Sequence, residues 1–306
     1  MSEESKLREQ AKQKAEQLLS VVGHPVQVLK LENQAILRCV NNLREQQPEQ
    51  AEDGKQKLEI IKKHYVKKQD LIYPVLEASY EISGPSRVLW AEDDRIRGQI
   101  RHLSLDKIPA LLDAIEAMVN KEEVVLIPMC VQYFTMEQWY EIYRDLSGYN
   151  YGCGTSYPVW QKAEVWLKEQ ARESRCQLCP ESEDPMQEIQ LSTGHLSLSH
   201  LDALLKTIPI EMTFVDETDT NRLFTSGGTG FKRSLSAMDR NVMTCHPPKA
   251  VNAVEKIIAS FRSGEKDMVE YKLPKGNKIL KIQYIAVRDD DGTYLGTLEC
   301  VRELDF

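Results

Sequence analysis

Two stretches of the chain repeat one another and hold side chains that can bind metals. HYVKKQDLIYP (64–74) aligns with MVNKEEVVLIP (118–128), so that His64 stands opposite Met118 and Glu123 stands opposite a glutamine. Such a repeat predicts a helical bundle with pseudo-twofold symmetry, and many bundles build metal centres from facing side chains. His64 and Glu123 have the types needed for metal ligation or for an acid/base pair.

Cysteine and histidine also occur together in two other places. Cys245 and His246 precede a helix, where His246 is either a cap, an axial ligand for haem, or a contact to a small anionic ligand. Cys176 and Cys179 form a lone CxxC pair, without the second ligand pair of a zinc site or the βαβ setting of a thioredoxin-like motif. We interpret this pair as chance spacing on a linker, with a thiol switch or zinc shared between chains as alternatives. No catalytic triad or dyad stands out, so we expect no enzyme activity.

The periodicity of the chain predicts helices first and a sheet afterwards. Short loops separate the helical segments of residues 21–167, so consecutive helices should be antiparallel neighbours in a bundle. Thr135 with Gln138 predicts a capping box. The apolar stripe within 241–262 needs a sheet to lie on, and three strands are predicted after it, at 267–273, 278–287 and 294–301. The predicted fold class is therefore α plus α/β, an antiparallel helical bundle followed by a domain with an antiparallel sheet.

Composition excludes several classes of function. The chain has 306 residues and a formal net charge of −8, with dispersed acidic residues and no basic footprint for nucleic acid. No apolar run reaches membrane-spanning length, and the polar segment 1–17 is unlike a signal peptide. Seven cysteines without a dense framework favour a reducing cytoplasm. We expect a cytoplasmic protein with neither a nucleic-acid nor a membrane partner.

Several motifs are specific enough to show a family resemblance. In the first half of the chain they are GHPV (23–26), HYVKKQDLIYP, VLWAEDDRIR (88–97) and EEVVLIPM (122–129). In the second half they are IEMTFVDETDTNRLF (210–224), FKR (231–233), NVMTCHPPKAVNAVEKIIASFRSG (241–264) and IQYIAVRDDDGTYLGTLE (282–299). Together they resemble a bacterial sensor family in which a hemerythrin-like bundle precedes a PAS domain. The resemblance implies four segments: an N-terminal helix (1–20), the bundle (21–167), a linker (168–190) and the PAS domain (191–306).

The resemblance also implies an oxo-bridged diiron site with histidine and carboxylate ligands. The matching positions in this sequence are Gln27, His64, Gln69, Asp93, Met118 and Glu123. Only His64 and Glu123 keep the expected type, and Asp93 retains an oxygen donor. Neutral glutamine and the methionine thioether are poor partners for ferric iron. We therefore predict a degenerate bundle that keeps the fold without the diiron chemistry, with a single-metal remnant at His64, Asp93 and Glu123 as the alternative.

The resemblance implies a sensor rather than an enzyme. In this interpretation the PAS domain receives a small-molecule ligand or a redox cue, with Cys245, His246, Arg233 and Tyr284 as candidate contacts. Haem or another small molecule in the PAS cavity is the candidate cofactor, and iron in the bundle is not expected. A homodimer formed through the PAS domain is the expected assembly. The alternatives are an iron- or oxygen-binding protein, a haem-binding PAS protein, and a scaffold with an empty PAS core.

Overall fold

The computed structural model describes residues 3–45, 51–80, 83–103, 105–149, 151, 157–178, 188–225, 233–275 and 278–304. The chain divides into two compact units, one formed mainly by residues 1–167 and the other mainly by residues 168–306. Buried apolar side chains form a core in each unit.

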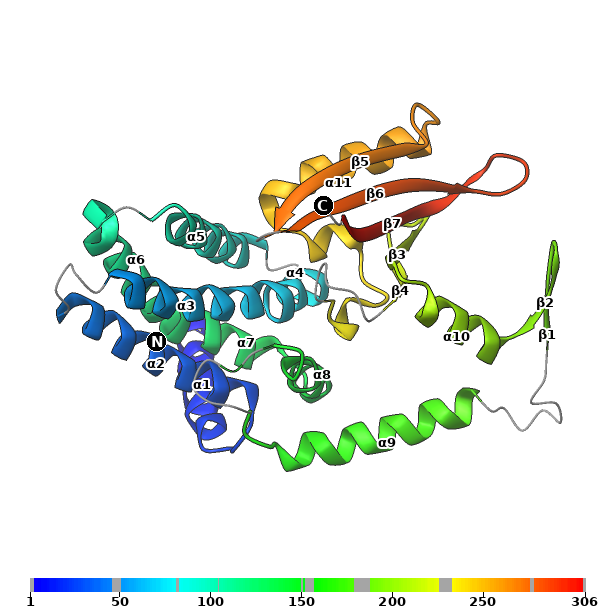
Figure 1. The fold of residues 1–306 in the computed structure, drawn as a ribbon. Coiled ribbons are helices and arrows are strands. Elements are labelled where there is room, and N and C mark those ends of the chain that lie inside the picture. The colour runs from blue at the N-terminus through cyan, green and yellow to red at the C-terminus, as the bar shows by residue number, and fades with distance from the viewer. Residues whose placement is uncertain are drawn as a thin grey trace. The chain divides into compact units, whose positions relative to one another are not determined.

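The first unit is the predicted helical bundle, coloured blue to green in Figure 1. Its helices are α1 (Glu3–Leu19), α2 (Pro25–Glu45), α3 (Ala51–Leu71), α4 (Tyr73–Tyr80), α5 (Ser83–Arg101), α6 (Ile108–Lys121), α7 (Ile127–Tyr133) and α8 (Met136–Leu146), with a 3₁₀ turn η2 (Leu105–Lys107) and a π-helical turn η3 (Glu122–Leu126). Helix α9 (Gln161–Leu178) follows and runs into the stretch 168–190, where we expected a linker.

Local sequence explains how two of these helices begin. Thr135 and Gln138 form the predicted capping box ahead of α8: the Gln138 backbone N–H donates to the Thr135 hydroxyl at 3.2 Å, and the Thr135 N–H donates to the Gln138 side chain at 3.0 Å. The π-helical turn η3 lies directly ahead of Pro128. Proline has no N–H and its ring crowds the carbonyl four residues earlier, so a wider turn at this place relieves the contact.

Aromatic side chains fill much of the bundle core. Tyr73 stacks on Trp90 with ring centroids 5.5 Å apart. His24 packs against Trp139 and Trp160 at centroid distances of 5.0 and 4.4 Å. Burying one large apolar side chain contributes about 2–3 kcal/mol. The bundle therefore has an extensive packed core to hold its helices together.

The second unit contains an antiparallel sheet with the strand order β4-β3-β7-β6-β5. Its strands are β3 (Glu211–Asp216), β4 (Asn221–Phe224), β5 (Met268–Lys275), β6 (Lys278–Arg288) and β7 (Tyr294–Leu304). The other elements are β1 (Glu188–Leu191), β2 (Gly194–Ser197), α10 (Leu198–Thr207), the 3₁₀ turns η4 (Leu235–Ala237) and η5 (Val242–Cys245), and α11 (Pro248–Arg262). Ile258 of α11 packs against Val215 of β3, so the predicted helix-on-sheet arrangement is confirmed.

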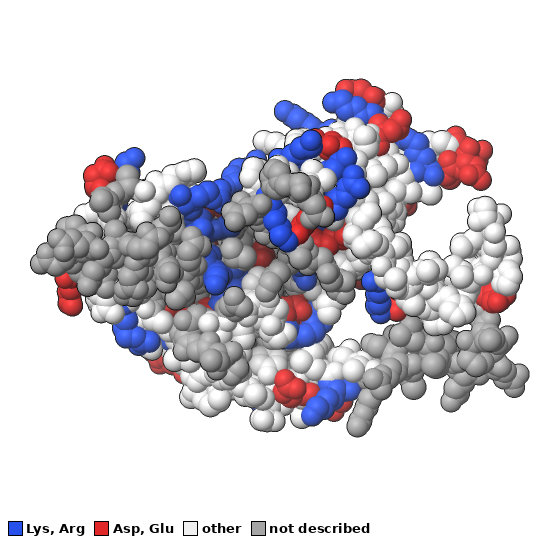
Figure 2. Space-filling model, in the orientation of Figure 1, with Lys and Arg blue, Asp and Glu red and all other residues white. Residues whose placement is uncertain are grey.

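The surface carries both signs of charge. Figure 2 shows lysine and arginine interspersed with aspartate and glutamate on the face that is drawn, without a field of one sign covering it. Among the described helices, none has both the length and the apolar composition needed to cross a bilayer.

Gly23 provides a first test of the bundle. Its φ is +79°, and a Cβ there would lie 2.5 Å from Trp160 N and 2.6 Å from Pro158 O. We expect Gly23→Ala to lower the free energy of unfolding by on the order of 2 kcal/mol or more, because neither backbone atom can move away cheaply. Thermal unfolding followed by the helical circular dichroism signal measures this.

The matched control is Gly98→Ala in α5, where a Cβ would meet no atom within 4 Å. This change should be neutral or stabilising by up to about 1 kcal/mol, since alanine is the better helix former. Equal melting temperatures for Gly23→Ala and the unmodified protein would contradict the close approach of these two loops.

Candidate functional site

One face of α3 carries three ionisable side chains into the bundle interior. His64, Lys67 and Lys68 recur at three- and four-residue spacing, which places them on one side of an α-helix. His64 and Lys67 are 2% exposed and Lys68 is 0% exposed. Ile61 and Leu71 lie on the same side and are also buried. When Ile61 and Leu71 pack into the core, the charged side chains on the same side of α3 are therefore buried with them.

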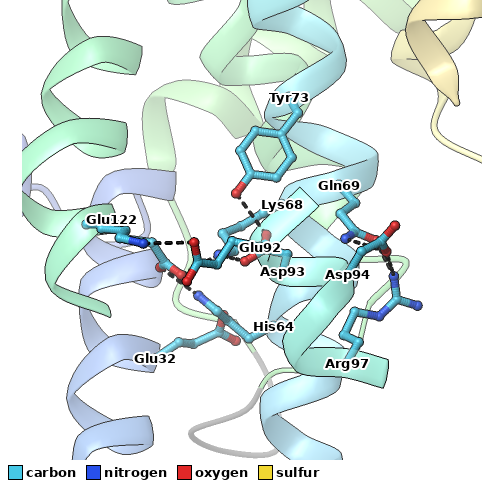
Figure 3. Close-up of polar contacts among 11 residues, drawn as sticks. Glu32, His64, Lys68, Gln69, Tyr73, Glu92, Asp93, Asp94, Arg97 and Glu122 are labelled. Atoms are coloured by element: carbon cyan, nitrogen blue, oxygen red, sulfur yellow. Dashed lines mark hydrogen bonds and ion pairs between the residues drawn. The ribbon is translucent and has the colours of Figure 1, made fainter. Parts of the chain in front are cut away.

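Carboxylates from neighbouring elements meet the imidazole of His64 (Figure 3). Its Nδ1 lies 2.8 Å from Glu32 Oε2 of α2, and its Nε2 lies 3.0 Å from Glu122 Oε2 of η3. Lys67 donates to the other oxygen of Glu32. Both imidazole nitrogens are therefore engaged by carboxylates.

The ammonium of Lys68 lies between the carboxylates of Asp93 and Glu122. Its Nζ donates to Asp93 Oδ1 of α5 at 2.9 Å and also to Glu122 Oε1. The ring of Tyr65 faces the ammonium, 4.4 Å from centroid to Nζ. The second oxygen of Asp93 accepts a hydrogen bond from the Tyr73 hydroxyl at 2.8 Å. Lys68 thus joins α3 to α5 and to η3.

We call the six groups Glu32, His64, Lys67, Lys68, Asp93 and Glu122 the ionic network. They are three carboxylates and three nitrogen bases, so their charges balance when His64 carries a proton. Such balance matters because an unpaired charge in a protein interior is strongly destabilising.

The pKa values of the network follow from this arrangement. Burial alone would raise the pKa of Glu32, but the hydrogen bond and charge of His64 and the charge of Lys67 lower it to about 2. Burial would lower the pKa of His64, but Glu122 and Glu32 together raise it. For Asp93, burial and the charge of Glu122 outweigh Lys68 and raise the pKa, while Lys68 and His64 lower the pKa of Glu122 against its burial.

The structure places two of the three predicted metal ligands in the ionic network. His64 and Asp93 belong to it, but Glu123 does not: it pairs with Lys30, and the two side chains are 27% and 31% exposed. The inward-facing carboxylate is the neighbouring Glu122. The reason is that the helix stays α-helical through Lys121, so the residue one turn after the buried Met118 is Glu122, and the wider π-turn begins only there.

The other positions expected from the diiron pattern have structural roles here. Gln27 accepts from the Gly23 N–H at 2.9 Å and donates to the Leu19 carbonyl at 3.2 Å, so it fastens the loop ahead of α2. Gln69 donates to Asp94 at 3.2 Å. Met118 is fully buried in the apolar core.

The internal repeat accounts for the central ion pair. In the alignment of 64–74 with 118–128, Lys68 stands opposite Glu122. The structure brings these equivalent positions into contact through the bundle interior. Sequence reasoning missed Glu32, Lys67, Lys68 and Glu122 because charged side chains are usually exposed. The signal that could have found the lysines is their helical spacing from Ile61 and Leu71.

The second unit has its own polar cluster, on the sheet face that packs against α11. Thr213 of β3, Glu299 of β7 and Tyr284 of β6 are successive partners across the sheet, and we call them the polar row. Arg233 donates from Nη2 to Glu299 Oε2 at 2.5 Å. Burial and the carboxylate of Glu299, to which the Tyr284 hydroxyl donates, raise the pKa of Tyr284.

The polar row separates two apolar clusters of the PAS-like core. Val215, Val242 and Ile258 form one cluster, and Leu280, Ile282 and Val301 form the other. Thr213 is 6% exposed, and its hydroxyl makes no hydrogen bond within the described structure. Arg233 Nε is likewise buried without a partner there. Buried polar atoms usually have partners, so this place has unused hydrogen-bonding capacity.

Cys245 and His246 are the other two residues that the sequence predicted as ligand contacts. Asn221 Nδ2 lies 3.5 Å from Cys245 Sγ, and burial raises the pKa of this thiol, while the charges of Arg240 and Arg233 act in the opposite direction. His246 donates from Nδ1 to the Val242 carbonyl at 2.8 Å, a bond within its own turn. The structure thus links Arg233 with Tyr284 through Glu299, and it leaves the roles proposed for Cys245 and His246 as predictions.

The CxxC pair lies at the end of the described part of α9. Cys179 lies outside the described residues, and the side chain of Cys176 is not described although its backbone belongs to α9. Its interpretation as chance spacing stays a prediction.

Comparisons with known proteins match both units. The family model "Hemerythrin HHE cation binding domain" matches residues 24–130, and the family model "PAS domain" matches residues 201–305. No curated protein matches the chain.

Three solved structures are similar to parts of the chain. The C-terminal domain of a Streptococcus mutans protein is 32% identical, with a TM-score of 0.38, over 39% of this chain and 94% of that one. A sensory box sensor histidine kinase from Vibrio cholerae is 14% identical, with a TM-score of 0.27, over 35% and 92%. The PAS domain of a Colwellia psychrerythraea protein is 12% identical, with a TM-score of 0.27, over 35% and 96%.

The ionic network does not fit the diiron centre that the resemblance implies. The Lys68 ammonium contacts two of the three carboxylates, and the Lys67 ammonium contacts the third. Both nitrogens of His64 face carboxylates. Within the described residues, no group of three histidine, cysteine, aspartate or glutamate side chains converges in a way that could hold a metal ion. A cation of higher charge would have to displace these ammonium groups.

Glu32 gives the network a distinct pH dependence. Its pKa falls from 4.5 in the unfolded chain to about 2 in the folded one, so its contribution to stability is complete above pH 4.5 and is lost as the pH falls towards 2. We expect Glu32→Gln to cost roughly 3 kcal/mol near neutral pH, with the cost shrinking across this window. Urea unfolding at a series of pH values, followed by the helical signal, measures it.

Glu123→Gln is the matched control, because Glu123 forms a lysine pair of the same chemistry at a partly exposed position. Its effect should stay within about 0.5–1 kcal/mol at every pH. A Glu32→Gln cost that persists unchanged to pH 2 would show that packing, and not charge, sets the role of Glu32.

Proposed function

The chain is a two-domain protein in which a hemerythrin HHE domain precedes a PAS domain, and we propose that it is a sensor. In this proposal the PAS domain binds a small molecule, and the bundle keeps the hemerythrin fold without a diiron site. The family models support the sensor or metal-binding class in general. The ligand and the loss of the iron site are the parts that this proposal adds.

The observation that carries the proposal is the polar row inside the PAS domain. The buried Thr213 hydroxyl and Arg233 Nε have no partners in the described structure, although both lie beside Glu299. A ligand with a hydrogen-bond acceptor, such as a carbonyl oxygen, would satisfy the Nε–H and the hydroxyl together. Because Glu299 already neutralises Arg233, this place favours an uncharged polar group over a second anion.

Three further parts of the proposal come from the sequence. The protein is non-enzymatic in this proposal, because no Ser-His-Asp, Cys-His or paired-carboxylate arrangement stands out in its sequence. It acts in the cytoplasm, since its cysteines are few and dispersed; Cys39, Cys130, Cys245 and Cys300 are free thiols in the described structure. It dimerises through the PAS domain, which would allow a bound ligand to change the assembly. A redox cue at Cys245 and haem at His246 remain alternatives for the input.

Native mass spectrometry of freshly purified full-length protein tests the PAS ligand. We expect one non-covalent organic molecule per chain, and at least a tenfold loss of its retention in Thr213→Val, about 1.4 kcal/mol for one lost hydrogen bond. The variant itself should be as stable as the parent or more so, because the hydroxyl has no internal partner to lose. A haem mass with a Soret band would support the haem alternative instead.

Thr297→Val is the matched control for this experiment. Thr297 is also buried, at 4% exposed, but its hydroxyl is bonded to the Tyr294 hydroxyl at 2.8 Å. The control should lose about 1 kcal/mol of stability and keep the ligand. Undiminished ligand in Thr213→Val, or no adduct in the parent protein, would contradict a site at the polar row.

Elemental analysis tests the bundle. We expect well below one equivalent of iron per chain and no absorption from an oxo-bridged pair, because the carboxylates are already paired with lysine. Protein purified with iron added throughout growth and lysis gives the strictest form of the measurement. Two equivalents of iron would overturn this part of the proposal and would support the alternative of an iron- or oxygen-binding protein.

A further inference from the structure

The bundle contains a cation of its own at the centre of its carboxylates. We infer that Lys68, assisted by Lys67, is a built-in cation that closes the bundle interior to metal ions, and that removing the charge of Lys68 opens a binding site for a divalent transition metal. This inference rests on the proposal that the bundle lacks iron, and it goes further by naming the residue that keeps metal out.

The contacts of Lys68 are those of a fully satisfied ion. An ammonium has three N–H groups and no acceptor. Lys68 Nζ donates to Asp93 and to Glu122, and its remaining side faces the ring of Tyr65. With 0% of the residue exposed, bulk solvent does not reach the ammonium. The Lys68 ammonium is therefore surrounded by two carboxylates and the face of an aromatic ring, all of which attract a positive charge.

Lys67 neutralises the remaining carboxylate. Its Nζ donates to Glu32 and lies 3.2 Å from the Tyr157 hydroxyl. The two lysines thus divide the three carboxylates between them, and His64 bridges the two halves through Glu32 and Glu122. A divalent ion among these carboxylates would lie close to two ammonium groups in a medium of low dielectric, where repulsion is strong.

The donor atoms beneath the lysines are of types that metals bind. Glu32, Asp93 and Glu122 offer carboxylate oxygens, and His64 offers an imidazole nitrogen. Such a mixed set is the kind that manganese, iron and zinc ions take in proteins. As the side chains of the described residues lie, these donor atoms do not converge on one point, because the Lys68 ammonium stands between Asp93 and Glu122. A metal site would form only when Asp93, Glu122 and the His64 imidazole close into the space that this ammonium leaves.

Without the Lys68 ammonium, Asp93 and Glu122 would be buried anions without a full counterion. Binding a cation would then lower the free-energy cost of burying them.

The experiment compares Lys68→Met with the unmodified full-length protein. Methionine keeps most of the apolar stem of lysine and removes its charge. Each protein is stripped with a chelator, incubated separately with Mn²⁺, Fe²⁺ and Zn²⁺, passed through a desalting column and analysed for metal content and melting temperature. We expect about one equivalent of at least one ion in Lys68→Met, a melting temperature that rises on loading, and reversal by the chelator.

Lys30→Met is the matched control, because Lys30 forms a pair with Glu123 at a partly exposed position. This variant and the unmodified protein should retain at least tenfold less metal and show no shift in melting temperature. Lys68→Met that folds and retains no metal would overturn the inference while leaving the proposed sensor function intact. Stoichiometric metal in the unmodified protein would instead overturn the proposal of a metal-free bundle.

A second variant decides the case in which Lys68→Met does not fold even with metal. Lys68→Met with Glu122→Gln removes one positive and one negative charge together. If this double variant folds without metal and binds none, the ammonium acts as a counterion, as inferred. If it also fails to fold, Lys68 acts through packing and the inference is wrong.

Discussion

The pairing of buried charges is the constraint on which the helical domain depends. Moving a carboxylate or an ammonium out of water costs several kcal/mol per ion, and only close partners recover that cost. The ionic network meets this requirement by joining α2, α3, α5 and η3 through His64, Lys67 and Lys68 on a single helix face. Because a charge left without its partner is far more costly than the pair, these elements are held in one arrangement. We infer that the network fixes one arrangement of these elements more than it adds net stability, because replacing a buried ion pair by apolar residues is often neutral or stabilising.

The position of one residue in a helix decides which carboxylate joins this network. Glu122 and Glu123 are adjacent and chemically identical, yet one is buried against Lys68 and the other pairs with Lys30 near the surface. The family resemblance pointed to Glu123, because positions were matched along the sequence without regard to where the helix changes its winding. Pro128 gives a local reason for a π-turn, but the point at which that turn begins depends on the packing of Met118 and Leu126 in the core.

Much of the fold was predictable because its signals are local. The capping box at Thr135 and the strands around 278–287 and 294–301 follow from short-range spacing, and the structure has them. The interior of the bundle was not predictable in the same way. Buried lysines contradict the usual partition of residue types, and Lys67 and Lys68 are inside only because acidic partners from distant segments meet them there. A helical projection of α3 shows the face, but it does not show the partners.

The two domains use polar interiors in opposite ways, and this contrast bears on where a ligand binds. Every member of the ionic network has a charged partner within the bundle, so an incoming molecule would have to displace an existing ion pair. In the polar row, Glu299 is paired with Arg233 and Tyr284, but the neighbouring Thr213 hydroxyl and Arg233 Nε have no partners in the described structure. A ligand there would gain hydrogen bonds without breaking any. On this energetic ground the PAS domain is the better receptor, and the hemerythrin-like bundle is better suited to hold a fixed shape.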